Sequence, residues 1–323
     1  MDRVWAATPV GETQGNPKRQ RNALARLADV AQSTLPLFSR VVHAASRAKD
    51  ELRQRLLGDD FEERVKSLRH RYVTLGGDPF GFDPEAVRRA ALASSFFHRA
   101  YFRTDVYDVD RVPEGRVMLV ANHSGQIPID AAIIGCSLFF DANPPRITRA
   151  MVDKWTATLP FVSTFFSRMG QVVGLPENAR RLLDMGELLL VFPEGMRGVS
   201  KPFEERYQLQ EFGRGFMRLA LETKTPIVPV GVIGAEEQYL SLGRISWAAR
   251  AFGLPVFPFV PQMLLPGGQM PLPTKYRLFF GEPMFFEGDP DDAAAVADKV
   301  YLVREAVAHI LRRGLAQRRS IFL

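Results

Sequence analysis

The sequence predicts an α/β fold in which the strands of a largely parallel sheet alternate with helices. Short apolar runs at 116–121, 187–192 and 227–233 have the length and character of buried strands. Apolar residues recur at helical spacing between several such runs, for example over 177–184 and 213–223. Alternation of this kind is typical of layered α/β domains built on a parallel sheet.

Size and composition suit one large globular domain or two small ones. The chain has 323 residues, of which 46% are hydrophobic, and its single cysteine, Cys136, rules out an internal disulfide. This cysteine usage fits a reducing compartment. A net charge of +6 and a pI of about 9.6 favour an anionic partner, such as a membrane surface, a phosphorylated substrate or nucleic acid, without choosing among them.

The apolar runs are short. None reaches the roughly 18 residues that a membrane-spanning helix needs, and no apolar signal region follows the N-terminal charges. The sequence therefore predicts a cytoplasmic protein. A sharper hypothesis makes it a peripheral protein on the cytoplasmic face of a membrane.

The N-terminal part is expected to differ from the rest of the chain. Residues 1–20 mix Gly, Pro, Thr and Gln and are predicted to be disordered. Residues 21–75 are predicted to form a helical hairpin, because apolar residues recur at helical spacing over 24–38 and again within the charged segment 49–72. This hairpin either packs against the main domain or contacts a membrane, as basic amphipathic helices often do.

A main domain is expected over residues 80–323. Its first helix would have Asp83 as the N-cap and Pro84 at the first helical position, and would end near Tyr101. Strands are predicted over the ranges 105–109, 116–121, 146–151, 171–174, 187–192, 227–233 and 276–280. A final amphipathic helix is predicted over 291–313, with Gly314 ending it.

Two apolar segments do not follow the strand–helix alternation. The segment 245–270 is rich in aromatic residues but is broken by prolines at positions 255, 258, 261 and 266, so it is neither a helix nor a central strand. A long loop or a set of short elements is expected there, in contact with a membrane or a ligand. The segment 155–169 either lines a ligand site or packs in the core.

His123 is the first candidate for a catalytic residue. It lies at a turn between a predicted strand and a helix, and ligands bind at the carboxyl ends of the strands in open α/β sheets. Its neighbours Ser124 and Gly125 are small and would leave room for a substrate. Asp130 follows on the first turn of the helix, where it could fix the imidazole tautomer and leave the other nitrogen as a base. A satisfied structural histidine is the alternative.

A second motif, 192–198, also follows a buried strand. Gly195 and Gly198 would let backbone amides approach an anion, and Arg197 could hold a phosphate or carboxylate through two parallel bonds. A plain turn with a solvated arginine is the alternative for this motif.

A third motif is the strand 226–234, which contains Pro229. A proline at this position suggests a sheet edge or a break that shapes a pocket. The sequence has no nucleophile elbow, no P-loop, no Rossmann glycine fingerprint and no zinc-like cluster of Cys and His. We therefore expect no metal site, no bound cofactor and no nucleotide hydrolysis.

Together the three motifs resemble the glycerolipid acyltransferase family, which includes the PlsC-like lysophosphatidic acid acyltransferases. The resemblance rests on Asn122-His123 with Asp130, on the run from Phe192 to Arg197, and on Val228-Pro229-Val230. It covers 106–286, and the segment 271–283 also resembles a late strand in the branch that acylates neutral glycerides. The resemblance implies a mixed sheet wrapped by helices, often preceded by a two-helix membrane-binding motif.

The resemblance also implies an activity. The protein would transfer a fatty acyl group from acyl-CoA or acyl carrier protein, as co-substrate, to a hydroxyl of a glycerolipid or lysophospholipid, without an acyl-enzyme. His123 would be the base and Asp130 its orienter, and Glu194, Gly195 and Arg197 would line the acceptor side. Arg197 or the backbone amides of the Ser124–Gln126 turn would stabilise the oxyanion. A membrane surface is an expected partner, and nucleic acid is not.

This sequence departs from the family pattern at several positions. Six residues, 124–129, separate the histidine from the aspartate, where the family usually has four. The stretch 170–178 lacks the arginine of the family's second block, although arginines at 168, 180 and 181 flank it. Met196 and Gly198 stand where threonine and serine are usual. A non-catalytic lipid-binding protein and an acyl thioesterase therefore stay open as alternatives.

Overall fold

The computed structural model describes residues 46–74, 76–124, 128–154, 158–199, 201–245 and 258–323. The chain divides into two units, Met1–Arg55 and Leu56–Leu323. The described part of the first unit, 46–55, is helical. The predicted disorder of 1–20 and the first half of the predicted hairpin lie outside the described residues.

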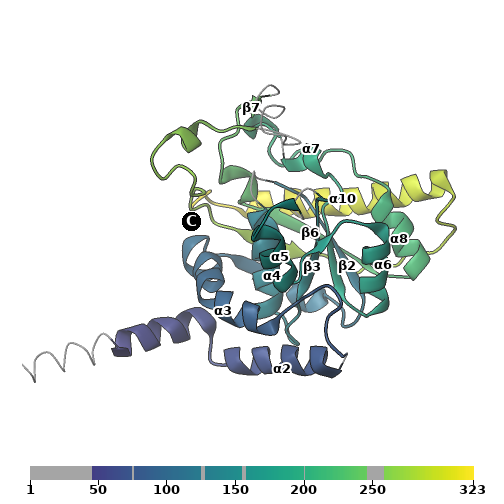
Figure 1. Cartoon of the computed structure of the whole chain (residues 1–323). Coiled ribbons are helices and arrows are strands. Elements are labelled where there is room, and N and C mark those ends of the chain that lie inside the picture. The colour runs from purple at the N-terminus through teal and green to yellow at the C-terminus, as the bar shows by residue number, and fades with distance from the viewer. Residues whose placement is uncertain (1–45, 75, 125–127, 155–157, 200, 246–257) are drawn as a thin grey trace, which may run out of the picture. The chain divides into compact units, whose positions relative to one another are not determined.

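A seven-stranded mixed sheet forms the centre of the larger unit, in the order β1-β9-β6-β2-β5-β3-β4 (Figure 1). Strands β6, β2, β5, β3 and β4 run parallel to one another, whereas β9 is antiparallel to β6 and β1 is parallel to β9. The strands are β1 (Asp105–Tyr107), β2 (Val117–Ala121), β3 (Thr148–Val152), β4 (Val172–Val173), β5 (Leu188–Val191), β6 (Ile227–Ile233) and β9 (Arg277–Phe280). The predicted α/β fold with a mixed, largely parallel sheet is thus confirmed.

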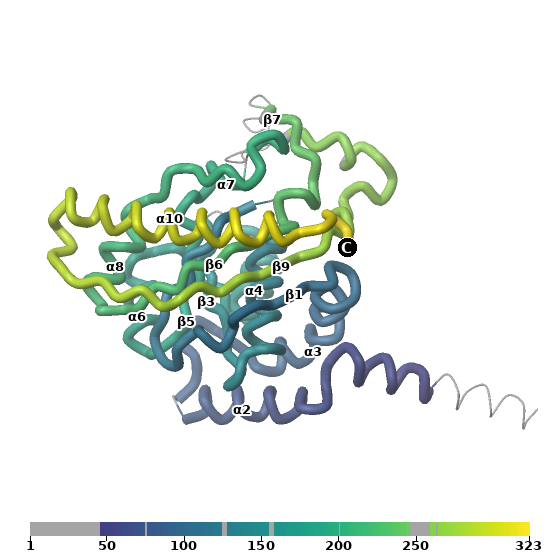
Figure 2. The backbone as a smooth tube through the Cα atoms, turned by 180° about the vertical axis from the view of Figure 1, so that it is seen from behind, coloured from purple at the N-terminus to yellow at the C-terminus, as the bar shows by residue number. Residues whose placement is uncertain are grey.

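Helices cover both faces of this sheet, because the buried residues of each strand alternate between two cores. Met118 and Val120 of β2 pack in one core with residues of α6 (Pro176–Asp184), α8 (Gly215–Thr223) and α10 (Ala293–Gln317). The other residues of β2 pack in a second core with α4 (Ile129–Phe140). Figure 2 shows α10 running along the sheet beside β6.

A third core forms around the helices that precede the sheet. Phe61, Val65, Leu68 and Tyr72 of α2 (Phe61–Thr74) pack with buried residues of α3 (Pro84–Ser95) and α4. The charged segment 49–72 was expected to be one helix, but it is interrupted at Gly58, whose φ of 86° is in the left-handed region. The larger unit begins at Leu56 and includes α2.

The helix predicted from Asp83 to Tyr101 is present in two parts. The Asp83 carboxylate accepts a hydrogen bond from the Glu85 amide at 2.9 Å, as an N-cap does. From Phe96 onward the helix widens into the π-helix η1 (Phe96–Tyr101).

The prediction that Gly314 ends the last helix is wrong. Asp292 caps α10 at its start, and the helix continues to Gln317. A Cβ on Gly314 would lie 2.5 Å from Cδ1 of Ile233 and 2.6 Å from the Phe279 ring. This glycine allows α10 to pack closely against the sheet rather than stopping it.

Of the two alternatives for Pro229, the sheet edge is wrong, because all seven residues of β6 are buried and the strand pairs on both sides. The ladder with β9 ends at Phe280 and continues beyond it only as an isolated bridge between Ile227 and Met284. Opposite Pro229 the regular pairing is interrupted, and the proline contributes only its carbonyl, to the Gly281 amide at 2.8 Å. A missing amide is tolerated at such an irregularity.

Short elements follow β6, as expected for the proline-broken segment 245–270. Strands β7 (Gly243–Arg244) and β8 (Pro258–Phe259) pair antiparallel, and the 3-10 helix η6 (Pro261–Leu264) comes next. Residues 246–257 lie outside the described part of the chain. Among the described helices, none has the length and apolar character needed to cross a bilayer.

Candidate active site

Asn122 fixes the chain where β2 ends. Its amide nitrogen donates to the carbonyl of Val232 at 3.0 Å, and its amide oxygen accepts from the Val232 backbone N–H at 2.8 Å. Both bonds join the end of β2 to β6, its parallel neighbour. The turn that carries His123 is therefore anchored to the centre of the sheet at its carboxyl edge.

His123 and Asp130 are in direct contact. Nδ1 of His123 lies 2.7 Å from Oδ2 of Asp130, whose carboxylate is fully buried, at 0% exposure of its side chain. The same carboxylate accepts hydrogen bonds from the backbone N–H groups of Ser124 at 3.0 Å and Ala131 at 2.8 Å. The six-residue separation is therefore compatible with a His–Asp pair, because α4 begins just before Asp130 and turns its carboxylate back toward the imidazole.

Phe192 stacks on the imidazole of His123, with ring centroids 4.1 Å apart and the planes inclined by 20°. Phe192 follows β5, which pairs with β2, so the two rings meet at the same edge of the sheet. Within the described part of the chain, Nε2 of His123 has no hydrogen-bond partner, and the side chain is 14% exposed. The ring is thus held by one nitrogen and one face, and its second nitrogen is left for a substrate.

Glu194 supports the histidine through its backbone. One carboxylate oxygen accepts the backbone N–H of His123 at 3.0 Å, and the other accepts the N–H of Gln210 at 2.8 Å. The side chain is buried, so both oxygens serve the protein's own backbone. In this position Glu194 supports the loop that carries His123, and its expected place in the lining of an acceptor site stays a prediction.

Lys201 links this support to a second buried carboxylate. Its ammonium lies 3.4 Å from Oε2 of Glu194 and 3.1 Å from Oε2 of Glu236, and it also donates to the Gln208 carbonyl. Burial raises the pKa of the Glu236 carboxyl, and the charge of Lys201 opposes that rise. Neither Lys201 nor Glu236 was identified from the sequence, where each lies among other charged residues and carries no distinctive spacing.

The second motif is arranged around two glycines. Gly195 has a φ of 55°, and its amide donates to the Phe192 carbonyl within the turn. A Cβ on Gly198 would lie 2.9 Å from Cβ of Glu194 and 3.1 Å from the His123 carbonyl. The motif therefore packs directly against the histidine turn, and Gly198 is the residue that makes this approach possible.

Arg197 points to the surface. Its guanidinium contacts the Glu211 carboxylate at 3.1 Å and the Glu211 carbonyl at 3.2 Å, and its side chain is 54% exposed. The Ser124 amide, part of the alternative expected for oxyanion binding, donates to Asp130. Gly125, the other small residue expected in the site, lies outside the described residues.

Comparison with known proteins assigns the family. A family model described as Acyltransferase matches residues 103–233. An uncharacterized protein of Mycobacterium tuberculosis is 39% identical over 282 residues, which are 84% of this chain and 74% of that protein. The chain belongs to the acyltransferase family. This membership confirms the resemblance drawn from the three motifs.

Other similarities are more distant. The mouse protein named DGAT1/2-independent enzyme synthesizing storage lipids is 27% identical over 186 residues, which are 57% of this chain and 53% of that protein. The crystal structure of the 1-acyl-sn-glycerophosphate acyltransferase of Thermotoga maritima matches 74% of this chain and 84% of its own, at 21% identity and a TM-score of 0.45.

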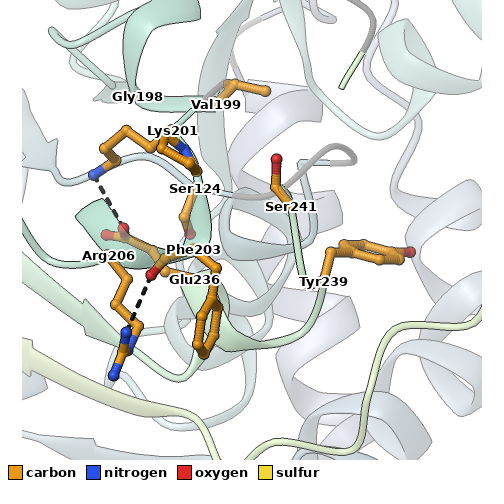
Figure 3. Close-up of a pocket in the computed structure, with 10 residues that line it drawn as sticks. Ser124, Gly198, Val199, Lys201, Phe203, Arg206, Glu236, Tyr239 and Ser241 are labelled. Atoms are coloured by element: carbon orange, nitrogen blue, oxygen red, sulfur yellow. Dashed lines mark hydrogen bonds and ion pairs between the residues drawn. The ribbon is translucent and has the colours of Figure 1, made fainter. Parts of the chain in front are cut away.

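A small pocket adjoins the histidine turn of this acyltransferase family member (Figure 3). Ser124 and Gly198, which adjoin His123, form part of its wall. The lining also includes Lys201, Phe203, Glu236 and Ser241. The histidine turn, the second motif and the segment after β6 therefore meet around one space.

Proposed function

We propose that the protein transfers a fatty acyl group from an acyl thioester, acyl-CoA or acyl carrier protein, to a hydroxyl of a glycerolipid or lysophospholipid. The observation that carries this proposal is the 2.7 Å contact between His123 and Asp130, with the second imidazole nitrogen facing no described partner. Membership of the acyltransferase family supports the reaction class.

Asp130 would set the tautomer of His123. Three N–H donors converge on its carboxylate, from the His123 ring and from the backbone of Ser124 and Ala131. A carboxylate that accepts the Nδ1 proton leaves the lone pair on Nε2. The first turn of α4 adds a favourable helix-dipole interaction with the negative charge.

The chemical step would then use Nε2 as a general base. Nε2 removes the proton of the acceptor hydroxyl as its oxygen attacks the thioester carbonyl carbon. The tetrahedral intermediate collapses with cleavage of the carbon–sulfur bond. The imidazolium returns its proton to the departing thiolate, so the products are an ester and a free thiol. The stacked Phe192 and the backbone support of Glu194 would hold the ring still throughout.

We further propose that the protein works at a membrane surface on the cytoplasmic side. The described residues include exposed large apolar side chains that would suit contact with lipid, notably Phe161 at 87%, Leu264 at 78% and Leu265 at 65% exposure. The name of the mouse relative refers to synthesis of storage lipids, which supports a glyceride among the acceptors to be tested.

Mass spectrometry of products tests the proposal. The purified full chain is incubated with acyl-CoA or acyl carrier protein and a panel of lysophospholipids, monoacylglycerols and diacylglycerols. New ester products that disappear with His123→Ala are expected. Free fatty acid without an esterified acceptor would indicate a thioesterase, and unchanged thioester with every acceptor would indicate a non-catalytic lipid-binding protein.

A further inference from the structure

We infer that Lys201 is a positioning residue for the acyl transfer, which holds the turn that carries His123 by tying two buried carboxylates, those of Glu194 and Glu236, to each other. This inference rests on the proposed function and goes beyond it, because Lys201 belongs to none of the three sequence motifs.

Lys201 is enclosed by the protein and has three acceptors. Its side chain is 3% exposed, and its ammonium lies 3.1 Å from Oε2 of Glu236, 3.4 Å from Oε2 of Glu194 and 3.3 Å from the carbonyl oxygen of Gln208. Figure 3 shows the ammonium directed at Glu236. Lysine is almost never buried unless it is paired, and an ammonium has three N–H groups to donate. The ammonium is therefore fixed between three partners.

The two carboxylates hold neighbouring residues at the end of β2. Glu194 accepts the backbone N–H of His123 at 3.0 Å, and Glu236 accepts from the side-chain amide of Asn122 at 3.4 Å. Glu194 follows β5 and Glu236 follows β6, the two strands that pair with β2. Each neighbouring strand thus supplies one carboxylate to the same turn, and Lys201 joins the two.

The second contacts of the carboxylates extend this connection. Glu194 also accepts the N–H of Gln210 at 2.8 Å, and Glu236 accepts the N–H of Tyr207 at 2.8 Å. The charge of Glu194 raises the pKa of the Glu236 carboxyl and the charge of Lys201 lowers it, so the three groups act on one another. Without the ammonium, each carboxylate would keep its backbone donors but lose its link to the other.

The position of the histidine backbone matters for the reaction. Asp130 and Phe192 fix the imidazole ring, whereas Glu194 fixes the backbone from which the ring extends. A displacement of about 1 Å at a reacting group can lower a rate roughly 10²-fold. Loss of the link through Lys201 would therefore lower kcat although the ammonium takes no part in proton transfer.

Two variants of the full chain separate positioning from folding. Lys201→Met removes the link but leaves two buried carboxylates without their cation, and it may fold poorly. Lys201→Met combined with Glu236→Gln removes one charge of each sign, so the net charge of the cluster is unchanged. The double variant is expected to recover much of the stability and to keep kcat roughly ten- to hundredfold below wild type, because the link is absent from both proteins.

Initial rates are measured with one acyl-CoA and with monoacylglycerol or lysophosphatidate, and kcat is expressed per folded molecule from urea unfolding. The KM values should stay within roughly threefold of wild type, because positioning of the base acts on the chemical step. Leu68→Ala, in the buried core around α2, is the control for lost stability. It should lower stability by a comparable amount and leave kcat per folded molecule unchanged.

The outcomes distinguish this inference from the proposed function. If kcat recovers together with stability in the double variant, or if it falls equally in Leu68→Ala, the positioning role of Lys201 is overturned. Wild-type transfer with an unchanged kcat in both Lys201 variants overturns that role too and leaves the proposed function intact. Absence of transfer by the wild-type chain with either acceptor would count against the proposed function and the inference together.

Discussion

The imidazole of His123 and the carboxylate of Asp130 are joined at 2.7 Å even though six residues separate them in the chain. The contact is possible because His123 lies just after β2, which ends at Ala121, and Asp130 lies on the first turn of α4, which begins at Ile129. The longer spacing leaves the pair itself intact.

Asp130→Asn is expected to lower kcat by roughly 10³- to 10⁴-fold, as a wrong imidazole tautomer does in other His–Asp pairs. The amide retains the shape of the carboxylate but removes its charge, so the KM for acyl-CoA should change little. Steady-state kinetics on the purified variant measure this, with circular dichroism to confirm the fold. A variant that keeps more than a tenth of the wild-type kcat would contradict the role of Asp130.

Gly198→Ala is expected to reduce both stability and activity. The new Cβ would lie 2.9 Å from Cβ of Glu194 and 3.1 Å from the His123 carbonyl, so the histidine turn has to shift. Overpacking of this kind costs roughly 1–3 kcal/mol. Gly215→Ala is the matched control, because a Cβ there meets nothing within 4 Å. Chemical denaturation should show a loss for Gly198→Ala only, and equal stability of the two variants would refute the close approach.

Lys201→Met is expected to destabilise the protein by roughly 3–5 kcal/mol, because it leaves two buried carboxylates without their cation. Burial already raises the pKa of Glu236, and loss of Lys201 removes the charge that opposes the rise. A carboxyl with a raised folded-state pKa costs stability above that pKa, and the cost fades as the pH falls through it.

The stability loss of Lys201→Met should therefore be largest at neutral and alkaline pH and shrink at mildly acidic pH. Urea unfolding at several pH values measures it, and Lys66→Met, an exposed lysine on α2, provides the control. A loss that is independent of pH would show that ionisation of the buried carboxylates does not cause it.

Arg197→Ala should change stability little, since its ion pair with Glu211 is exposed on both sides and such pairs are worth at most about 1 kcal/mol. If acceptors are uncharged, their acylation should stay within roughly threefold of wild type, the range expected for loss of an exposed pair. Rates with monoacylglycerol measure this. A large drop would show that the arginine leaves Glu211 to bind substrate.

Replacing both Leu264 and Leu265 by Asn is expected to weaken binding to phospholipid vesicles roughly tenfold, because two exposed leucines would each lose part of their transfer free energy. Vesicle sedimentation measures the change. Leu302→Asn, at an exposed leucine on α10, is the control. Equal binding of all three proteins would exclude this segment from the membrane contact.

Local sequence patterns determined the positions of several helices and strands and of the His–Asp pair. The strand β6 begins and ends at the predicted residues, and α6 and α8 lie within two residues of theirs, because hydrophobic periodicity and helix caps act over a few neighbouring positions. His123 and Asp130 could be identified for the same reason, since a strand, a turn and the first turn of a helix bring them together within one short segment.

Only the tertiary structure decided which residues support the His123–Asp130 pair. Glu194 reaches the His123 backbone across 71 positions of sequence, and Asn122 reaches Glu236 across 114. Such contacts depend on which strands become neighbours in the sheet. The same holds for Pro229, which is tolerated in a central strand only because the β9 ladder is interrupted opposite it, and for Gly314, which lies inside a helix because the sheet approaches it too closely for a side chain.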